Sequence, residues 1–235
     1  MSVAATTTEY AEYVRGAWSR FMANPARARA SLDVVADKQV ARVLDVGCGA
    51  GQELFPFVKE RGALGVGIDV LPEAGKVGRA LFAEHHEEKR FVFLRAAAEA
   101  LPFQSESFDV VICRLALPYT DNRRTLAEFA RVLRSGGVLF LKTHHANFYL
   151  HKFKQGIGER DARSMVHAAR VLAAGAIYHL SGRQPRLRIP STETFQSAWL
   201  LRRELARCGL RIRREMPDSD SATPSFLIVK NGQLI

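Results

Sequence analysis

The order of hydrophobic and polar positions predicts strands that alternate with helices through the first two thirds of the chain. Short apolar runs indicate strands, and apolar residues three or four positions apart indicate helices. The predicted strands are 40–46, 63–69, 91–95, 108–113 and 138–142. The predicted helices between them are 52–61, 72–84 and 122–133, the last ended by Ser135-Gly136-Gly137. This alternation is typical of a doubly wound, mostly parallel α/β sheet that binds its ligand at the carboxyl ends of its strands.

Further elements are predicted on both sides of this alternating part. Helical spacing marks residues 8–23, a second helix that reaches about residue 35, and the long stretch 160–180. A helix over 192–208 and strands over 210–214 and 225–230 follow. Because 146–190 is too long for a plain connection, we expect an inserted helical cap there. The predicted organisation is an N-terminal helical lid (1–37), a core (38–145), the cap (146–190) and a C-terminal completion of the sheet (191–235).

One predicted strand-to-helix turn has a specific glycine pattern. Asp45-Val46-Gly47-Cys48-Gly49-Ala50-Gly51 follows an apolar run. Glycines are needed where the backbone takes a positive φ or where a ligand lies against it. The next strand ends in Asp69, eighteen positions after Gly51. An acid at the tip of the second strand is the usual partner of ribose hydroxyls. Together these features predict a site for a nucleoside-containing cofactor.

These segments resemble the motifs of class I S-adenosylmethionine-dependent methyltransferases of type 11, in the small-molecule branch that includes the ubiquinone and menaquinone enzymes. The glycine turn resembles motif I, and matching segments follow in order at 67–69, 98–103 with 107–111, and 131–139. The resemblance implies a Rossmann-like sheet of seven strands whose last two form an antiparallel pair at the edge. It implies S-adenosyl-L-methionine as cofactor, S-adenosyl-L-homocysteine as product, and methyl transfer by in-line displacement.

The resemblance also assigns cofactor-binding residues. The backbone of Gly47, Cys48 and Gly49 is expected against the methionine part of the cofactor, and Asp69 is expected to accept both ribose hydroxyls. The other residues assigned to this site are Asp45, Gly51, Val70, Ala98, Glu99 and Arg114. Two alternatives stay open: Asp69 as a helix cap ahead of Pro72, and Cys48 as a small residue that fits a tight turn.

Two positions depart from the family pattern. Ala97 stands where relatives carry an acid that accepts from the adenine amino group, and Glu99 is the carboxylate next to it. Losing one charged hydrogen bond costs at most about 1.5–3 kcal/mol, so cofactor binding should survive in weakened form. Pro118 stands where relatives often carry a His near the transferred methyl group. Tyr119 is the candidate replacement, with plain packing as its alternative.

Methyl transfer from a sulfonium mainly requires alignment of the acceptor and exclusion of water. A base is needed only if the accepting atom must lose a proton, and histidine titrates in the suitable range. The candidates are His144 and His145 for catalysis and His151 for the substrate side, each with a structural role as the alternative. Tyr10, Tyr13 and Trp18 are the candidate lid residues, with packing on the sheet as the alternative.

The formal charge of +10 lies in one part of the chain. Residues 144–214 hold fourteen Lys and Arg against four Asp and Glu, while the remaining residues carry twenty of each sign. Five of the seven histidines are also in this segment. A basic, His-rich cap favours a small acceptor that bears a carboxylate or phosphate. The alternatives are an RNA acceptor bound by the basic segment, and a non-catalytic cofactor-binding subunit suggested by Ala97 and Pro118.

The remaining features of the sequence concern the cellular location of the protein. Cys48, Cys113 and Cys208 are far apart and form no metal-type pair, so no metal is expected and a reducing compartment is favoured. No apolar run is long enough for a membrane span, and residues 1–6 do not resemble a secretory signal. We therefore expect a cytoplasmic protein. An arginine-flanked stripe in 160–180 also allows attachment to a membrane surface. The acceptor, the methylated atom and the oligomeric state are left open.

Overall fold

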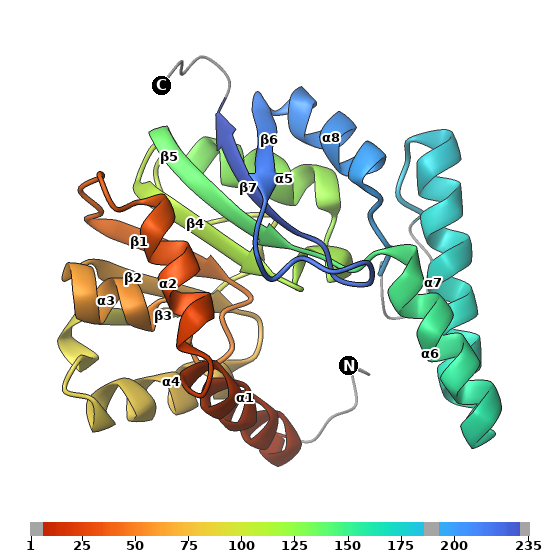
Figure 1. Ribbon diagram of the computed structural model, residues 1–235, viewed down its shortest axis with the longest axis horizontal. Coiled ribbons are helices and arrows are strands. Elements are labelled where there is room, and N and C mark those ends of the chain that lie inside the picture. The colour runs from red at the N-terminus through yellow and green to blue at the C-terminus, as the bar shows by residue number, and fades with distance from the viewer. Residues whose placement is uncertain (1–6, 186–192, 231–235) are drawn as a thin grey trace.

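The computed structural model describes residues 7–185 and 193–230, and one sheet of seven strands forms its centre (Figure 1). The strands are β1 (Arg42–Val46), β2 (Leu64–Asp69), β3 (Phe91–Arg95), β4 (Phe108–Arg114), β5 (Leu133–Lys142), β6 (Leu210–Glu215) and β7 (Ser225–Lys230). Their order is β3-β2-β1-β4-β5-β7-β6. β1 to β5 are parallel, and β7 pairs antiparallel with both β5 and β6. The predicted α/β fold class and the antiparallel edge pair are confirmed.

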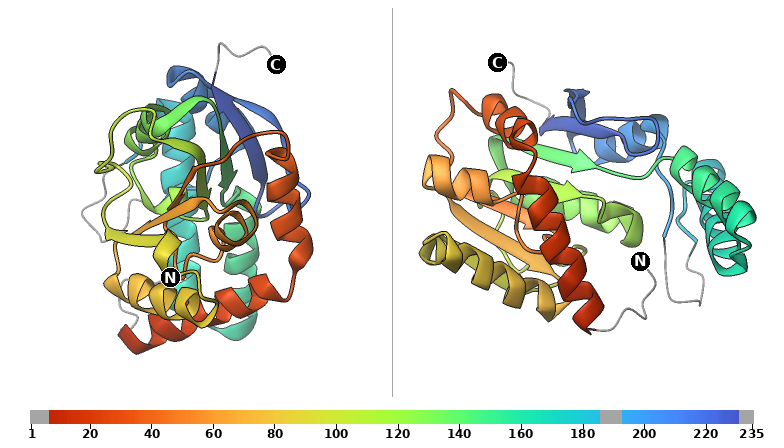
Figure 2. Two further views of the ribbon diagram at one scale, coloured as in Figure 1. Left: turned by 90° about the vertical axis from the view of Figure 1, so that its left-hand side faces the viewer. Right: turned by 60° about the horizontal axis from the view of Figure 1, so that its bottom comes forward.

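Helices cover both faces of this sheet. α1 (Thr7–Met22), α2 (Pro25–Val34), α3 (Phe55–Arg61) and α4 (Pro72–Glu84) pack on one face. α5 (Asn122–Val132) and α8 (Ala198–Arg207) pack on the other (Figures 1 and 2). Val43 and Leu44 of β1 point into these two separate cores and are fully buried. Burial on both faces explains why the central strands are continuous apolar runs.

The boundaries of two predicted helices are wrong. α3 begins at Phe55 rather than at residue 52, because the glycine turn continues to Leu54 and Pro56 supplies the first helical turn. Ser135-Gly136-Gly137 does not end α5 but lies inside β5, which follows α5 directly. A Cβ on Gly137 would lie 2.8 Å from the Asp109 carbonyl oxygen. Glycine is therefore required because β5 passes close to β4, a tertiary contact that the helix-stop pattern does not reveal.

Two helices occupy the segment for which one was predicted. α6 (Ala146–Glu159) and α7 (Ala162–Ser181) form an antiparallel pair that stands apart from the sheet, next to the end of β5 (Figure 2). The chain reverses at Arg160, whose φ is +55°, and Asp161 caps α7 by accepting from the Ser164 amide at 3.2 Å. A Cβ on Gly156 would lie 2.8 Å from Met165 Cγ. Gly156 thus lets the two helices approach closely. Glycine has a low helix propensity, so the same residue weakens the helical signal of α6 in the sequence.

The predicted helix over 192–208 is shorter than expected. α8 begins after Ser197, whose hydroxyl accepts from the Leu200 amide at 3.2 Å. Residues 193–196 have no regular secondary structure and include the buried Glu193 and Gln196. Thr192 and the 186–188 part of the predicted basic loop lie outside the described residues. None of the described helices is long and apolar enough to cross a membrane. Two short 3-10 turns, η1 (Glu88–Arg90) and η2 (Leu117–Tyr119), complete the described elements.

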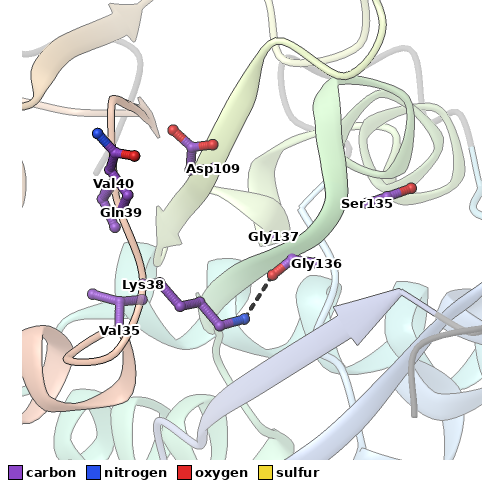
Figure 3. Close-up of a pocket in the computed structure, with 8 residues that line it drawn as sticks. All are labelled: Val35, Lys38, Gln39, Val40, Asp109, Ser135, Gly136 and Gly137. Carbon is purple, nitrogen blue, oxygen red and sulfur yellow. Dashed lines mark hydrogen bonds between the residues drawn. The ribbon is translucent and has the colours of Figure 1, made fainter. Parts of the chain in front are cut away.

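A hollow of about 290 Å³ lies at the amino ends of β1, β4 and β5 (Figure 3). Lys38 reaches across it and donates to the Gly136 carbonyl at 2.7 Å, and Asp109 lines its wall. Asp109 is held by the amides of Ala41 and Arg42 at 2.8 and 2.9 Å. This hollow is at the opposite edge of the sheet from the glycine turn, so it is not part of the predicted cofactor site.

α1 is anchored in the core by its central residues. Trp18 is 5% exposed, and its ring meets Phe55 at 5.1 Å and Phe82 at 5.6 Å between centroids. Val14 is also buried and lies against the glycine turn. These contacts favour the packing alternative for Trp18 over a role in a lid.

Replacing Trp18 with Ala should lower the free energy of unfolding by about 3–5 kcal/mol, because a large buried side chain leaves a cavity. Tyr13→Ala on the same helix is the control, with an expected change within about 0.5 kcal/mol since Tyr13 is half exposed. Urea unfolding measures both. Equal stability of the two variants would show that α1 does not belong to the core.

Candidate functional site

The glycine turn after β1 has the backbone shape that its sequence predicts. Gly47, Gly49 and Gly51 have φ values of +71°, +53° and +79°, which residues with a side chain rarely adopt. A Cβ on Gly47 would collide with the Cβ of Ala116, just beyond β4. The Gly47 and Cys48 amides both donate to the Ile68 carbonyl, at 2.9 and 3.0 Å. The turn is thus fixed between β2 and β4 at the carboxyl edge of the sheet.

Asp69 presents a hydroxyl-accepting carboxylate beside this turn. Its Oδ2 accepts from the Tyr10 hydroxyl at 3.0 Å and from the Gly49 amide at 3.2 Å. Its Oδ1 accepts from the Leu71 amide at 3.0 Å, which is the capping contact of the alternative interpretation. Both interpretations of Asp69 are therefore compatible. Burial, together with the neighbouring Asp69 charge, raises the pKa of the Tyr10 phenol, so this hydroxyl stays a donor.

A buried ionic cluster lies under the turn. Arg114 Nε is 3.2 Å from Glu53 Oε1, and its other nitrogens reach Asp218. Arg27 also pairs with Glu53. The Arg114 side chain is 9% exposed and contacts these two carboxylates. These contacts favour a role in stabilising the turn over direct contact with the cofactor.

Asp45 lies within reach of this cluster but is incompletely satisfied. It is 2% exposed, and its Oδ2 has no hydrogen-bond partner in the described part of the chain. Burial raises the pKa of Asp45 to about 7, and the charges of Arg114 and Arg27 offset part of the rise. A buried carboxylate oxygen without a partner is costly, and a bound cationic group would relieve the cost.

The other predicted cofactor residues differ in exposure. Cys48 is 1% exposed, burial raises the pKa of its thiol, and its Sγ would lie 2.7 Å from a Cβ on Gly67. Cys48 is therefore a small residue in a tight turn rather than a nucleophile. Ala98 is buried, whereas Val70 is 57% exposed beside Asp69. Glu99 accepts from the Asp121 amide at 2.9 Å and so also fixes the start of α5.

A second cluster gathers around Glu193, which the sequence analysis did not single out. Glu193 is 4% exposed. Its Oε1 accepts from the Tyr149 hydroxyl at 2.7 Å, and its Oε2 lies 3.2 Å from His167 Nε2. Tyr119 also hydrogen-bonds to Glu193. Burial raises the pKa of Glu193, but the contacts from His167 and Tyr149 outweigh it and hold that pKa below its usual value. One ionised carboxylate therefore joins η2, α6 and α7.

A signal for Glu193 was present in the sequence. Residues 144–214 contain only four acidic residues, and two of them, Glu193 and Glu204, are 4% and 3% exposed. An isolated acid in a basic segment is a candidate for a buried charge with several partners. Glu204 meets this expectation as well, since it pairs with Arg123, Arg203 and Arg207.

The contacts of His144 and His145, the histidines predicted for catalysis, are structural. His144 is 5% exposed, stacks on Phe148 at 4.0 Å and has Nδ1 3.1 Å from the Tyr149 hydroxyl. Burial lowers the pKa of His144 to about 4, so it is neutral at pH 7. His145 caps α6 through the Asn147 amide, and burial also lowers the pKa of its ring. These contacts favour the structural alternative for both residues over a catalytic base.

His151 points away from this cluster. Tyr149 and His151 are two residues apart on α6, which places them on opposite sides of the helix. Tyr149 faces Glu193, and His151 is exposed. His151 therefore does not belong to the Glu193 cluster, and its role on the substrate side stays a prediction. Its position in the sequence, shortly after β5, gave no information about its side of the helix.

Tyr13 and Tyr119 lie between the two clusters. Tyr13 stacks on Tyr10, with 6.2 Å between the ring centroids. Tyr13 is 50% and Tyr119 40% exposed, so both phenols are accessible. Burial and then the charge of Glu193 raise the pKa of Tyr119, which keeps this phenol protonated. No group of three or more His, Cys, Asp or Glu in residues 7–185 and 193–230 is arranged to hold a metal ion.

Comparisons with known proteins agree with this arrangement. Residues 44–141, from β1 to β5, match the methyltransferase domain family. The malonyl-[acyl-carrier protein] O-methyltransferase of Salmonella typhimurium is 33% identical over 203 residues, which cover 85% of this chain and 77% of that protein. The chain belongs to this methyltransferase family. The identification as a class I, type 11 S-adenosylmethionine-dependent methyltransferase is confirmed, and S-adenosyl-L-methionine is its cofactor.

Other similarities are narrower. The uncharacterized methyltransferase YcgJ of Bacillus subtilis is 37% identical over 109 residues, which cover 45% of this chain and only 41% of YcgJ. The crystal structure of magnesium protoporphyrin IX methyltransferase (ChlM) from Synechocystis PCC 6803 with bound SAH has a TM-score of 0.62 at 16% identity. That match covers 90% of this chain and 84% of ChlM, and it supports the fold alone.

The residues at the carboxyl edge fit this cofactor. Its ribose hydroxyls match the hydroxyl-accepting carboxylate of Asp69, which already binds the Tyr10 hydroxyl. Its methionine part carries an ammonium group, which suits the unpartnered Asp45 oxygen. We propose that Asp45, Gly47, Cys48, Gly49, Gly51 and Asp69 hold the cofactor, with Val70, Ala98 and Glu99 beside them.

The Tyr10 contact predicts an effect on cofactor affinity. Tyr10→Phe removes a hydroxyl that competes for Asp69, so S-adenosylmethionine should bind about fivefold more tightly. Asp69→Ala should weaken binding by about a hundredfold, since two charged hydrogen bonds are lost. Calorimetric titration measures both, with Tyr13→Phe as the matched control. Weaker binding by Tyr10→Phe would mean that its hydroxyl contacts the cofactor directly.

The burial of Asp45 predicts an unusual pH dependence of stability. Because its folded pKa of about 7 exceeds the ordinary 3.8, the folded protein holds a proton that the unfolded chain releases between these values. Stability should therefore fall as the pH rises from 5 to 8. Asp45→Asn cannot titrate, so at pH 8 it should be more stable than wild type by on the order of 2–4 kcal/mol.

Thermal and urea unfolding at pH 5 and pH 8 test this effect. Asp33→Asn, on the exposed side of α2, controls for the loss of one negative charge. The expected result is a larger loss of unfolding free energy between pH 5 and pH 8 in wild type than in Asp45→Asn. Parallel curves for wild type and Asp45→Asn would show that Asp45 is ionised throughout this range.

Proposed function

We propose that this methyltransferase acts on a small molecule that carries an anionic group, bound between α1 and the α6–α7 pair. The family supports a small-molecule acceptor. The accessible phenols of Tyr13 and Tyr119 lie between the Asp69 and Glu193 clusters, which favours this region for the acceptor. We also retain the proposed division of the chain, with 146–190 as a cap on the 38–145 core.

The main observation in favour of an anionic acceptor is the position of Lys152. Its ammonium group lies over the Phe148 ring, 4.9 Å from the centroid, and its charge acts on His144 beneath. No carboxylate in residues 7–185 and 193–230 is within ion-pair distance of Lys152. Lys142, by contrast, pairs with Asp218 at 3.3 Å. A cation held on an aromatic face without an internal counterion suits an anionic ligand.

The roles of the surrounding residues follow from their contacts. S-adenosylmethionine supplies an electrophilic methyl group on a sulfonium. Tyr119 presents its phenol to the acceptor, and Glu193 orients Tyr119 by accepting its hydrogen bond. A carboxylate or phosphate acceptor has no proton to lose, so the chain needs no base there. Neutral His144, stacked on Phe148, forms an apolar wall that excludes water.

The RNA alternative receives less support. Three arginines near α8, Arg123, Arg203 and Arg207, pair with the buried Glu204. One internal carboxylate therefore holds these three side chains in place, although the group keeps a net positive charge. The name of the Salmonella relative describes methylation of a malonyl group, which contains a carboxylate, and this agrees with an anionic acceptor. We propose cytoplasmic action.

Labelled S-adenosylmethionine and a panel of small carboxylic acids, each paired with its amide, test the proposal. The acid should be methylated at least tenfold faster than its amide. Lys152→Ala should raise KM for the acid about tenfold with little change in kcat, because a charge-assisted contact of about 1.4 kcal/mol is lost. Lys152→Arg should retain most of the affinity.

Lys154→Ala is the matched control, since Lys154 is exposed two residues further along α6. It should leave KM unchanged. Equal rates for acids and amides, or equal effects of the two lysine substitutions, would contradict the anionic acceptor while leaving the methyltransferase assignment intact.

A further inference from the structure

The outer face of α7 carries an apolar stripe that the fold leaves exposed. Val166 is 69%, Ile177 50% and Leu180 90% exposed. The exposed Ala169 and Ala173 lie between them, so the stripe follows spacings of three and four residues. The opposite side of α7 is buried against α6 and residues 193–196, through Ala168, Val171, Ala174, Gly175 and Tyr178. The helix therefore has two apolar faces, and only one of them is covered.

The charges around this stripe are mainly positive. Residues 162–181 contain Arg163 and Arg170 and no carboxylate, and Glu159 and Asp161 stand just before the helix. Arg170 is four residues after Val166 and three before Ala173, which places its stem at the edge of the stripe. Arg160 precedes the helix and Arg183 follows it. An apolar stripe bordered by arginines is the pattern of a helix that lies in the interface of an anionic lipid surface.

We propose that the outer face of α7 docks on an anionic membrane surface, with Val166, Ile177 and Leu180 inserted between headgroups and the arginines on lipid phosphates. The α6–α7 pair stands apart from the sheet, and α7 is reachable from outside (Figures 1 and 2). A second copy of the chain is a poorer occupant. Paired α7 helices would bring two positively charged stretches together, since residues 159–183 hold four Arg against Glu159 and Asp161.

This docking would place the acceptor region close to the lipid surface. His167 of α7 is 3.2 Å from Glu193, and Glu193 also holds Tyr149 and Tyr119. The helix proposed to touch lipid is thus the one that contacts the Glu193 cluster. The proposal does not depend on the acceptor, since the attachment requires only α7 and its arginines.

Flotation of the full chain with lipid vesicles tests the attachment. Wild type should bind vesicles of 70% phosphatidylcholine and 30% phosphatidylglycerol at least tenfold more strongly than pure phosphatidylcholine. The affinity should fall as salt rises, because the arginine contribution is screened. Arg163→Gln with Arg170→Gln should weaken binding about thirtyfold, at about fivefold for each charge. Leu180→Glu should weaken it about tenfold.

Met22→Glu is the matched control, because Met22 is a 40% exposed apolar residue at the end of α1, on the other side of the molecule. It should bind vesicles like wild type. Calorimetric binding of S-adenosylhomocysteine reports that each variant is folded, so a failure here is distinct from a failure of the methyltransferase site. Equal binding to both vesicle types, or no binding, would overturn the proposal. So would a dimer in light scattering that Leu180→Glu dissociates, since a second copy would then cover the stripe.

Discussion

The carboxylate of Asp69 joins three parts of the chain that are distant in sequence. It accepts hydrogen bonds from Tyr10 of α1, Gly49 of the turn and Leu71 ahead of α4. These bonds are possible because parallel strands bring the ends of β1 and β2 to one edge, and because glycine alone lets the turn approach there. The cofactor site depends on this contact. It also fixes α1, which carries Tyr13 of the proposed acceptor region.

A second buried carboxylate performs the same task on the other side of that region. Glu193 collects Tyr149, His167 and Tyr119, and so fixes the α6–α7 pair against η2. Each cluster alone orders its own elements. Together they set the distance between the cofactor turn and the cap, and Tyr13 and Tyr119 lie between them. The specific geometry therefore depends on two buried charges with several donors each, a type of contact that is costly if any partner is lost.

The sequence predicted the parts of this structure that rest on local pattern. Strand runs, the glycine turn and the acid at Asp69 each have a short-range signal, and all three are where the sequence places them. The sequence was less informative where a contact between distant residues determines the local structure. Gly137 serves the β4–β5 pairing, but in the sequence it was interpreted as part of a helix stop. Gly156 serves the α6–α7 contact, in a segment where no helix before residue 160 was predicted. Trp18, His144 and His151 were predicted from proximity in the chain, which does not determine the direction of a side chain. The contacts of Trp18 and His144 favour packing. Glu193 had a compositional signal but no motif.

The basic charge of residues 144–214 separates into portions with different surroundings. Arg203 and Arg207 of α8 share one carboxylate, Glu204, with Arg123. Lys152 lies over the Phe148 ring of α6, and Arg163 and Arg170 are on α7, where Arg170 also contacts His167 at 3.4 Å. A net charge counted over the whole segment would suggest a polyanion, such as RNA, as a single partner. Its division favours two anionic partners on opposite sides of one helical pair, a small acceptor within and a lipid surface outside.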